Sequence, residues 1–230
     1  MQDLQTVDKH TKQGINEMNK LTHLLSTTPI YGMTAEDLSY SHDNIADVRD
    51  MLSAGIKIIQ YREKEKSGKE MYAQCVKLRE MTREAGALFI IDDFADLALA
   101  VEADGVHIGQ DDLPIEAVRK IAGDRLFIGL STHSPEQALD AKKRGADYIG
   151  VGPIYETHTK KNVCAPVGLS YLDYVVQNID LPFVAIGGIK KHNLKEVYDH
   201  GAKCACLVTG IVGSENIQKE IAEIINLKTQ

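Results

Sequence analysis

The sequence lacks any apolar run that approaches the roughly 20 residues of a membrane-spanning helix. Its first residues, MQDLQTVDKHTKQG, lack the apolar core of a signal peptide. Proline-, serine- and glycine-rich runs of the kind that link domains are missing as well. We therefore expect a cytoplasmic protein with one catalytic domain and no contact with a membrane.

Cysteine and basic charge are both scarce. The four cysteines follow no disulfide or zinc-ligand spacing, so we expect reduced thiols. The 33 acidic residues outnumber the 26 basic ones, which gives a net charge of −7 and argues against a nucleic-acid partner. Small anionic substrates remain compatible, because a pocket on an acidic protein can be locally basic. The composition leaves open whether the chain forms a homo-oligomer.

Short apolar runs alternate with helical patterns from Pro29 onward. Strands are predicted at 29–33, 56–62, 88–92, 105–109, 126–130, 147–152, 183–187 and 204–209. Helices are predicted at 43–54, 68–85, 94–102, 114–122, 134–144, 168–178, 191–199 and 214–227. This alternation implies right-handed crossovers and a parallel sheet, and eight units favour a closed (β/α)8 TIM barrel of the α/β class. An open doubly wound sheet is the alternative, although no G-x-G-x-x-G follows the first strand.

Residues 1–26 precede the first predicted strand. Ile15, Met18, Leu21 and Leu25 recur at helical spacing within them, which predicts an amphipathic helix that packs against the barrel. The sequence thus divides into an N-terminal helical extension at 1–26 and a barrel catalytic domain at 27–230.

A weak internal repeat supports one unit used several times. Four predicted helices end in similar junctions before the next strand: Ala54-Gly55-Ile56, Ala103-Asp104-Gly105-Val106, Gly145-Ala146-Asp147-Tyr148 and Gly201-Ala202-Lys203-Cys204. A glycine past a helix end accepts the left-handed conformation that turns the chain into the next strand.

The second predicted strand ends in QYREK, with side chains that alternate between the two faces. Gln60, Arg62 and Lys64 therefore share one face with Ile58. If that face points inward, an amide, a guanidinium and an ammonium meet at the barrel mouth, which suits a diphosphate. The alternative is a charged run that stays in solvent.

Acidic residues follow the next two predicted strands. Asp92-Asp93 ends the third and Gln110-Asp111-Asp112 follows the fourth. Neighbouring strand ends are close enough for their carboxylates to share a Mg²⁺ ion, which prefers oxygen ligands and phosphate oxygens. Helix N-caps are the alternative role for these aspartates.

A second anion site is predicted across the barrel mouth. The long loop after the sixth strand, 152–168, carries hydroxyls and lysines and has the length of a substrate lid. Gly187-Gly188 and Thr209-Gly210 end the last two strands, where barrel enzymes often bind phosphate. Two phosphorylated small molecules that meet across one mouth would indicate group transfer.

These residues together resemble the motif set of the thiamine-phosphate synthase family over about residues 29–212. The matching motifs are QYREK (60–64), DD (92–93), ADGVHIGQDD (103–112), GLSTH (129–133), GPIYETHTKK (152–161), AIGGI (185–189) and VTGI (208–211). GVHIGQDD and GPIYETHTKK are specific, whereas IGGI alone is not. The resemblance implies that a pyrimidinylmethyl group passes from its diphosphate to the nitrogen of a thiazole phosphate, with Mg²⁺.

The resemblance also implies a role for each site residue. The pyrimidine diphosphate would be bound by Gln60, Arg62, Lys64, Asp92, Ser131 and Lys160, of which Ser131 and Lys160 would be catalytic. Mg²⁺ would be bound by Asp93 and Asp112. The thiazole phosphate would be bound by Thr157, Thr159, Gly168, Gly188, Val208 and Thr209.

The chain departs from the family pattern at three places. Asp92 stands where the family commonly has Asn, and a carboxylate there would repel diphosphate unless it binds metal or is protonated. Thr209-Gly210 replaces a Ser-Ala pair, which keeps the hydroxyl. The first strand ends in YGMTAE rather than Val-Thr-Asp.

Three other functions compete with this one. A thiazole tautomerase-like isomerase on the same fold shares GPIYET and IGGI but needs no diphosphate–Mg²⁺ site. A sugar-phosphate isomerase or epimerase needs acid–base residues, for which His107 is a candidate, although a mid-strand position predicts a packed core residue. A non-catalytic barrel that binds a phosphate ligand is the third alternative.

Overall fold

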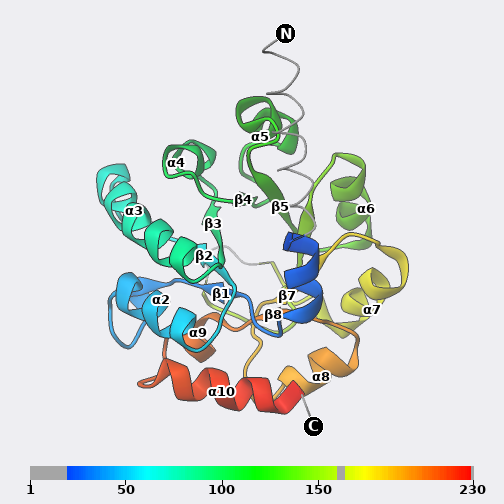
Figure 1. The fold of residues 1–230 in the computed structure, drawn as a ribbon. Helices are drawn as coiled ribbons and strands as arrows, with labels where there is room; N and C mark the ends of the chain where they lie inside the picture. Colours follow the sequence, from blue (N-terminus) through cyan, green and yellow to red (C-terminus); the bar gives the residue numbers. More distant parts are fainter. Residues whose placement is uncertain (1–19, 160–163, 229–230) are drawn as a thin grey trace.

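The computed structural model describes residues 20–159 and 164–228 as an eight-stranded parallel sheet inside a ring of helices (Figure 1). The strands are β1 (Gly32–Met33), β2 (Ile58–Tyr61), β3 (Leu88–Asp92), β4 (Gly105–Ile108), β5 (Phe127–Thr132), β6 (Tyr148–Val151), β7 (Phe183–Ile186) and β8 (Ala205–Cys206). They pair in sequence order. In this described part, no helix combines the length and the apolar character that a membrane crossing requires.

Backbone hydrogen bonds close the sheet into a barrel. The N–H of Tyr31 donates to the carbonyl oxygen of Ala205 at 3.0 Å, and the N–H of Ala205 donates to the carbonyl oxygen of Pro29 at 2.9 Å. These bonds join the first strand segment to β8, so the sheet has no free edge. The prediction of a closed TIM barrel is confirmed, and the open doubly wound alternative is excluded.

Helices follow the strands around the outside of the barrel. The longer ones are α2 (Asn44–Ser53), α3 (Gly68–Glu84), α5 (Ile115–Ala122), α6 (Pro135–Lys143), α7 (Gly168–Asn178) and α10 (Ile217–Lys228). Shorter ones are η1 (Glu36–Leu38), α4 (Ala95–Ala100), α8 (Leu194–Asp199) and α9 (Val208–Ile211). Local sequence explains several starts: Ser67 and Glu70 form a capping box at α3, and Ser134 caps α6 before Pro135.

Side chains of the strands alternate between two apolar layers. Ile59 and Tyr61 of β2 belong to the cluster between the sheet and the helices, whereas Ile58 belongs to a separate cluster inside the barrel. The face of β2 that carries Gln60 therefore points inward, as the alternation predicts.

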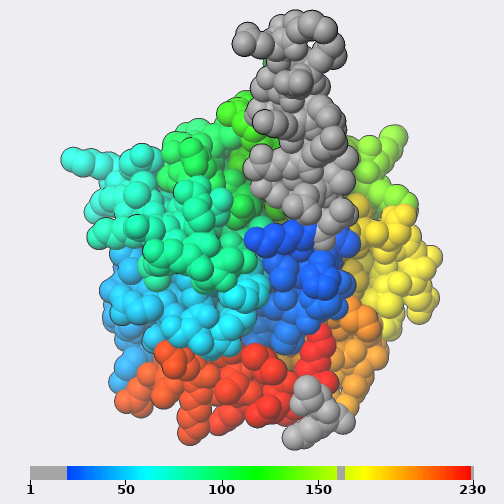
Figure 2. Space-filling model, in the orientation of Figure 1, coloured from blue at the N-terminus to red at the C-terminus, as the bar shows by residue number. Residues whose placement is uncertain are grey.

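The helical residues 20–27 close the amino-terminal end of the barrel. Leu21 and Leu25 are buried in the interior cluster, against Leu88 and Phe127 at the starts of their strands. Figure 2 shows this segment in blue at the centre of that face. This helix agrees with the predicted amphipathic extension, although Ile15 and Met18 lie outside the described residues; the domain division at residue 26 stays a prediction.

Two local predictions were wrong. The eighth strand is predicted to run through residue 209, but it ends at Cys206, where its pairing with Ile186 of β7 stops and the chain turns into α9. After α4, Glu102 rather than a glycine takes the left-handed conformation, with φ of 53°. Gly105 lies within β4, where an added Cβ would come within 2.9 Å of Ile90 Cδ1, so this glycine serves packing.

Candidate active site

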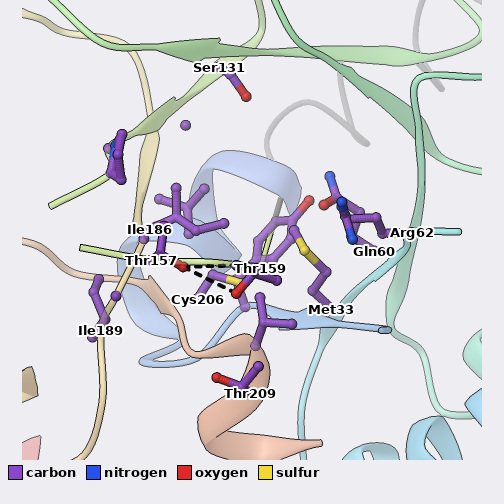
Figure 3. Close-up of a pocket in the computed structure, with 18 of the residues that line it drawn as sticks. Met33, Gln60, Arg62, Ser131, Thr157, Thr159, Ile186, Ile189, Cys206 and Thr209 are labelled. Carbon is purple, nitrogen blue, oxygen red and sulfur yellow. Dashed lines mark hydrogen bonds between the residues drawn. The ribbon is translucent and has the colours of Figure 1, made fainter. Parts of the chain in front are cut away.

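A cavity of about 380 Å³ opens among the carboxyl-terminal ends of the strands and the loops that follow them. Figure 3 shows Gln60 and Arg62 on one side of it and Ile186 and Ile189 on the opposite side. The polar lining includes Gln60, Arg62, Asp92, His107, Ser131, His133, Thr157, Thr159, Lys190 and Thr209. Eight of the side chains predicted for the site therefore line this one cavity: Gln60, Arg62, Asp92, Ser131, Thr157, Thr159, Val208 and Thr209.

The end of β2 supplies two buried polar side chains that each have an atom without a hydrogen-bond partner in the described part of the chain. Gln60 is 1% exposed and Arg62 is 8% exposed. Gln60 Oε1 and Arg62 Nε have no hydrogen-bond partner in the described part of the chain. Thr34 fixes the position of Arg62, because its hydroxyl oxygen accepts from the Arg62 N–H at 2.9 Å. Buried polar groups are normally paired, so these atoms indicate a polar ligand.

Lys64 contacts the two aspartates at the end of β3. Its Nζ lies 3.2 Å from Asp92 Oδ2 and also pairs with Asp93. Arg62 Nε lies 3.7 Å from the same Asp92 oxygen. Asp92 is thus paired with two cations, which compensate its buried negative charge. Only part of the charged run after β2 therefore stays in solvent.

Neither Asp93 nor Asp112 caps the helix that follows it. The N-cap residues of α4 and α5 are Phe94 and Pro114, and neither makes a side-chain cap hydrogen bond. Asp112 is exposed at the rim and its Oδ2 accepts from the Gly109 N–H at 2.7 Å. The N-cap alternative is therefore wrong for both aspartates.

Asp93 and Asp112 follow neighbouring strands, but the structure does not record a contact between them. The N–H of Asp93 donates to the carbonyl oxygen of His107 in β4 at 2.8 Å, which ties the two strand ends together. Across residues 20–159 and 164–228, no group of three or more acidic, histidine or cysteine side chains could hold a metal ion. Two carboxylates with substrate oxygens are nevertheless a usual Mg²⁺ donor set.

Ser131 lies at the cavity wall on β5, held from two sides. Its Oγ is 3.0 Å from His107 Nε2, and its carbonyl oxygen accepts from Gln110 Nε2 at 2.6 Å. On the next loop, His133 Nδ1 lies 2.6 Å from the carbonyl oxygen of Gly152. The structure therefore places Ser131 where its hydroxyl can reach a bound ligand.

The opposite part of the cavity is lined by hydroxyls, backbone N–H groups and one lysine. Thr157 and Thr159 lie with their hydroxyl oxygens 3.1 Å apart (Figure 3). Lys190 Nζ donates to the Thr209 hydroxyl and, within the described residues, has no carboxylate partner. Gly188 has φ of 66° and lies against the loop backbone at Glu156, where any Cβ would clash.

Gly188, Val208 and Thr209 line this part of the cavity as expected, whereas Lys64, Asp93 and Asp112 are not among the residues that line the cavity. Gly168 is the first residue of α7 and is absent from the lining. Lys160 lies outside the described residues. The roles of both stay predictions.

Sequence reasoning missed Lys190 and misplaced His107. Lys190 directly follows the IGGI motif, and that adjacency was the available signal. His107 pairs in register with Asp92, the last residue of β3, so it lies level with the strand ends rather than below them. The glycines at 129 and 150, which make room for its ring, were the signal for an inward-facing histidine.

Comparison with known proteins agrees with this arrangement. A family model described as thiamine monophosphate synthase matches residues 30–211. Thiamine-phosphate synthase of Pelotomaculum thermopropionicum is 62% identical over 192 residues, which cover 84% of this chain and 88% of that protein. The corresponding protein of Caldicellulosiruptor bescii is 52% identical over 204 residues, with 89% and 93% covered.

A solved structure gives the same result. The thiamine phosphate pyrophosphorylase of Pyrococcus furiosus superposes with a TM-score of 0.82 at 37% identity, over 90% of this chain and 98% of that one. The matched sequences and the matched barrel include the strand ends that form the cavity. This chain belongs to the thiamine-phosphate synthase family.

Proposed function

We propose that this enzyme transfers a 4-amino-2-methylpyrimidin-5-ylmethyl group from its diphosphate to the nitrogen of thiazole phosphate. The products are thiamine monophosphate and diphosphate. The observation that carries the proposal is a single cavity with cationic groups on one side and a hydroxyl-lined site with Lys190 on the other. The family makes the chain a transferase that acts on small molecules.

The diphosphate is assigned to the side of β2, β3 and β5. Arg62 offers Nε, and Lys64 offers an ammonium that lies 3.2 Å from Asp92, a residue of the cavity lining. Ser131 adds a hydroxyl from the wall. Charge-assisted hydrogen bonds of this kind stabilise the negative charge that builds up on a leaving diphosphate. Gln60 and Asp92 are assigned to the pyrimidine diphosphate as well, and Lys160 is assigned to it from the family pattern.

Mg²⁺ fits the donor chemistry at the ends of β3 and β4. Asp93 and Asp112 offer carboxylate oxygens after the neighbouring strands β3 and β4. Mg²⁺, when bound, supplies positive charge to the diphosphate oxygens and so favours departure of this group. Lys64 pairs with Asp93, so this ammonium and a bound Mg²⁺ would share the Asp93 carboxylate.

The thiazole phosphate is assigned to Thr157, Thr159, Gly188, Val208 and Thr209, together with Gly168 from the family pattern. Threonine hydroxyls and backbone N–H groups donate to phosphate oxygens. Lys190 adds the positive charge that these neutral donors lack, because its ammonium reaches Thr209.

The transfer breaks the bond between the pyrimidine methylene carbon and the diphosphate oxygen, and the bonding electrons leave with diphosphate. The ring amino group of the pyrimidine stabilises the resulting cation. The thiazole nitrogen then supplies its lone pair to the new carbon–nitrogen bond, so no general base is needed. The protein contributes orientation of the two reactants and stabilisation of the leaving charge.

The direct test measures diphosphate release by purified protein with Mg²⁺ and each substrate alone or both together. Release is expected only with both substrates, along with thiamine monophosphate. Release at the full rate from the pyrimidine diphosphate alone would contradict group transfer. Isomerisation of a thiazole without diphosphate release would favour the tautomerase alternative, and binding without turnover would favour a non-catalytic barrel.

A variant separates the two halves of the site. Arg62→Ala should weaken binding of pyrimidine diphosphate far more than binding of thiazole phosphate, because Arg62 belongs to one side of the cavity. Equal losses for the two substrates would contradict the division into two anion sites.

A further inference from the structure

Four side chains form a continuous line of hydrogen bonds from the barrel interior to the cavity wall. Tyr31 Oη lies 3.0 Å from Tyr148 Oη, and Tyr148 Oη lies 3.1 Å from His107 Nδ1. His107 Nε2 lies 3.0 Å from Ser131 Oγ. These residues come from β6, β4, β5 and the segment before β1, so the barrel itself holds the line together.

Two glycines make room for the line. A Cβ at Gly129 would lie 2.4 Å from His107 Nδ1 and 2.3 Å from Tyr148 Cζ. A Cβ at Gly150 would lie 3.3 Å from His107 Cε1. Any side chain at Gly129 would displace the histidine or the tyrosine, so the sequence of β5 is fitted to this arrangement.

The direction of the hydrogen bonds along this line decides which groups act as donors. Burial is the main cause that raises the pKa of both the Tyr31 and the Tyr148 hydroxyls, so both keep their hydrogens. Tyr31 Oη has no partner other than Tyr148 among residues 20–159 and 164–228. Tyr31 also lines the cavity, so the line could run in either direction; in the direction that the proposal takes, Tyr31 donates to Tyr148 and Tyr148 donates to His107 Nδ1.

This direction determines where the imidazole carries its hydrogen. A ring nitrogen that accepts a hydrogen bond leaves the hydrogen of the neutral ring on the other nitrogen. His107 therefore donates from Nε2 to Ser131 Oγ. The hydroxyl hydrogen of Ser131 then does not point at His107. It is free to point into the cavity, which Ser131 lines.

We propose that His107 is a positioning residue that directs the Ser131 hydroxyl hydrogen toward the diphosphate. This inference rests on the proposed function, because it takes the diphosphate as the anion at Ser131. An anion accepts hydrogen bonds and is repelled by oxygen lone pairs. If Ser131 donated its hydrogen to His107, it would turn its oxygen lone pairs toward the diphosphate. His107 in this tautomer donates to Ser131 instead, so the Ser131 hydroxyl can donate its hydrogen to the diphosphate.

The tautomer can be measured without any activity assay. Protein labelled with ¹⁵N in its histidines gives separate resonances for pyrrole-type and pyridine-type ring nitrogens. A His107→Asn sample identifies the His107 signals by their loss. The free enzyme at neutral pH should show the hydrogen on Nε2 of His107. A hydrogen on Nδ1, or on both nitrogens, would overturn the proposed direction.

Kinetics test whether His107 acts through Ser131. Asn at position 107 can still contact Tyr148 but does not reach Ser131. His107→Asn should raise the KM for pyrimidine diphosphate by about tenfold, the order expected for one hydrogen bond to a charged group. The KM for thiazole phosphate should stay within about twofold of wild type, since additive, uncoupled sites do not respond to one another.

A double-mutant cycle separates this inference from the proposed function. In a Ser131→Ala background, His107→Asn should have no further effect on pyrimidine diphosphate. The same loss in both backgrounds would show that His107 does not act through Ser131. Wild-type kinetics for Ser131→Ala alone would instead remove Ser131 from the diphosphate site, whatever the tautomer. His200→Asn, in a partly buried pair with Asp173 away from the cavity, is the matched control for a histidine replacement.

Discussion

Lys64 Nζ lies 3.2 Å from Asp92 Oδ2, and this carboxylate is buried while the lysine is partly exposed. The same oxygen faces Arg62 at 3.7 Å. Asp92 thus lies beside the two cations that we assign to the diphosphate. Under that assignment a substrate diphosphate competes with Asp92 for them, which is the basis of the first prediction.

Asp92→Asn should therefore tighten the binding of pyrimidine diphosphate. Loss of the carboxylate removes both the competitor for the cations and the repulsion of the anion. We expect the KM for pyrimidine diphosphate to fall by about threefold to tenfold, a change that corresponds to about 1 kcal/mol. Steady-state kinetics at fixed thiazole phosphate measure it.

The same variant should be less stable without ligand, because Arg62 then lies buried without an opposing charge. Its melting temperature should recover more than that of wild type when diphosphate is added. Asp96→Asn, at an exposed position in α4, is the control and should change neither quantity. A higher KM in Asp92→Asn would refute this account.

Lys190→Met should weaken the binding of thiazole phosphate, because it removes the positive charge that lies beside Thr209. The KM should rise by about 10- to 100-fold, the range for loss of a charge-assisted hydrogen bond. The unphosphorylated thiazole alcohol should lose little affinity, and comparison of the two ligands isolates the phosphate.

Lys191→Met is the matched control for Lys190→Met. Lys191 is next in the chain but pairs with Glu220 and Glu223 on the surface. Its loss should leave both substrates unaffected. The same penalty on alcohol and phosphate would mean that Lys190 supports the cavity rather than the anion.

Asp93→Ala and Asp112→Ala should each raise the Mg²⁺ concentration needed for half-maximal diphosphate release. The rise should be at least about tenfold, since loss of even an outer partner of a metal site costs that much affinity. Asp111→Ala, an exposed neighbour, is the control. Unchanged Mg²⁺ dependence in both variants would remove the metal assignment.

Leu21→Ala should destabilise the barrel from the end opposite to the cavity. Leu21 is fully buried in the interior cluster, so its truncation should lower the free energy of unfolding by about 2–5 kcal/mol. Urea unfolding measures this loss. Thr22→Ala, at the exposed neighbour, should change it little; equal effects would mean that the helix does not pack as described.

Thiol reactivity should distinguish Cys164 from the other cysteines. Cys164 is exposed, whereas Cys75, Cys204 and Cys206 are buried. Burial raises the pKa of the Cys75 and Cys204 thiols to about 12 from the ordinary value of 9.0. At pH 8 a thiol reagent should therefore modify one cysteine in the native protein and all four in urea. Rapid reaction of several native thiols would contradict this burial.

The same shifts give a direction for alkaline stability. A thiol whose pKa is raised by folding ionises more readily in the unfolded chain. Its contribution to stability is complete below about pH 9 and is lost as the pH rises toward 12. Replacement of Cys75 by Ala should flatten the fall in unfolding free energy above pH 9, and an unchanged slope would count against the shift.

The fold could be predicted because its signals are local. The run 88–92 is continuous and apolar, and the structure gives β3 the same bounds. The eighth strand was harder, because its length depends on where its neighbour β7 turns at Gly187. Pairing between strands that are distant in the sequence decides where β8 ends, and the spacing of apolar residues gives no information about that pairing.

For the site as well, features that depend on local sequence could be predicted, and features that depend on contacts between strands could not. Alternation along β2 was enough to turn Gln60 and Arg62 inward. The depth of His107 depends on the register between β3 and β4, which pairs it with Asp92. The compensation of Asp92 by two cations depends on side chains from two strands, so the sequence alone indicated only repulsion.

Leu21 and Leu25 fill the amino-terminal end of the barrel interior, while the cavity lies at the carboxyl-terminal ends of the strands. Stability and substrate binding therefore draw on opposite ends of one barrel, so changes in the amino-terminal helix can alter the first without touching the residues that line the second.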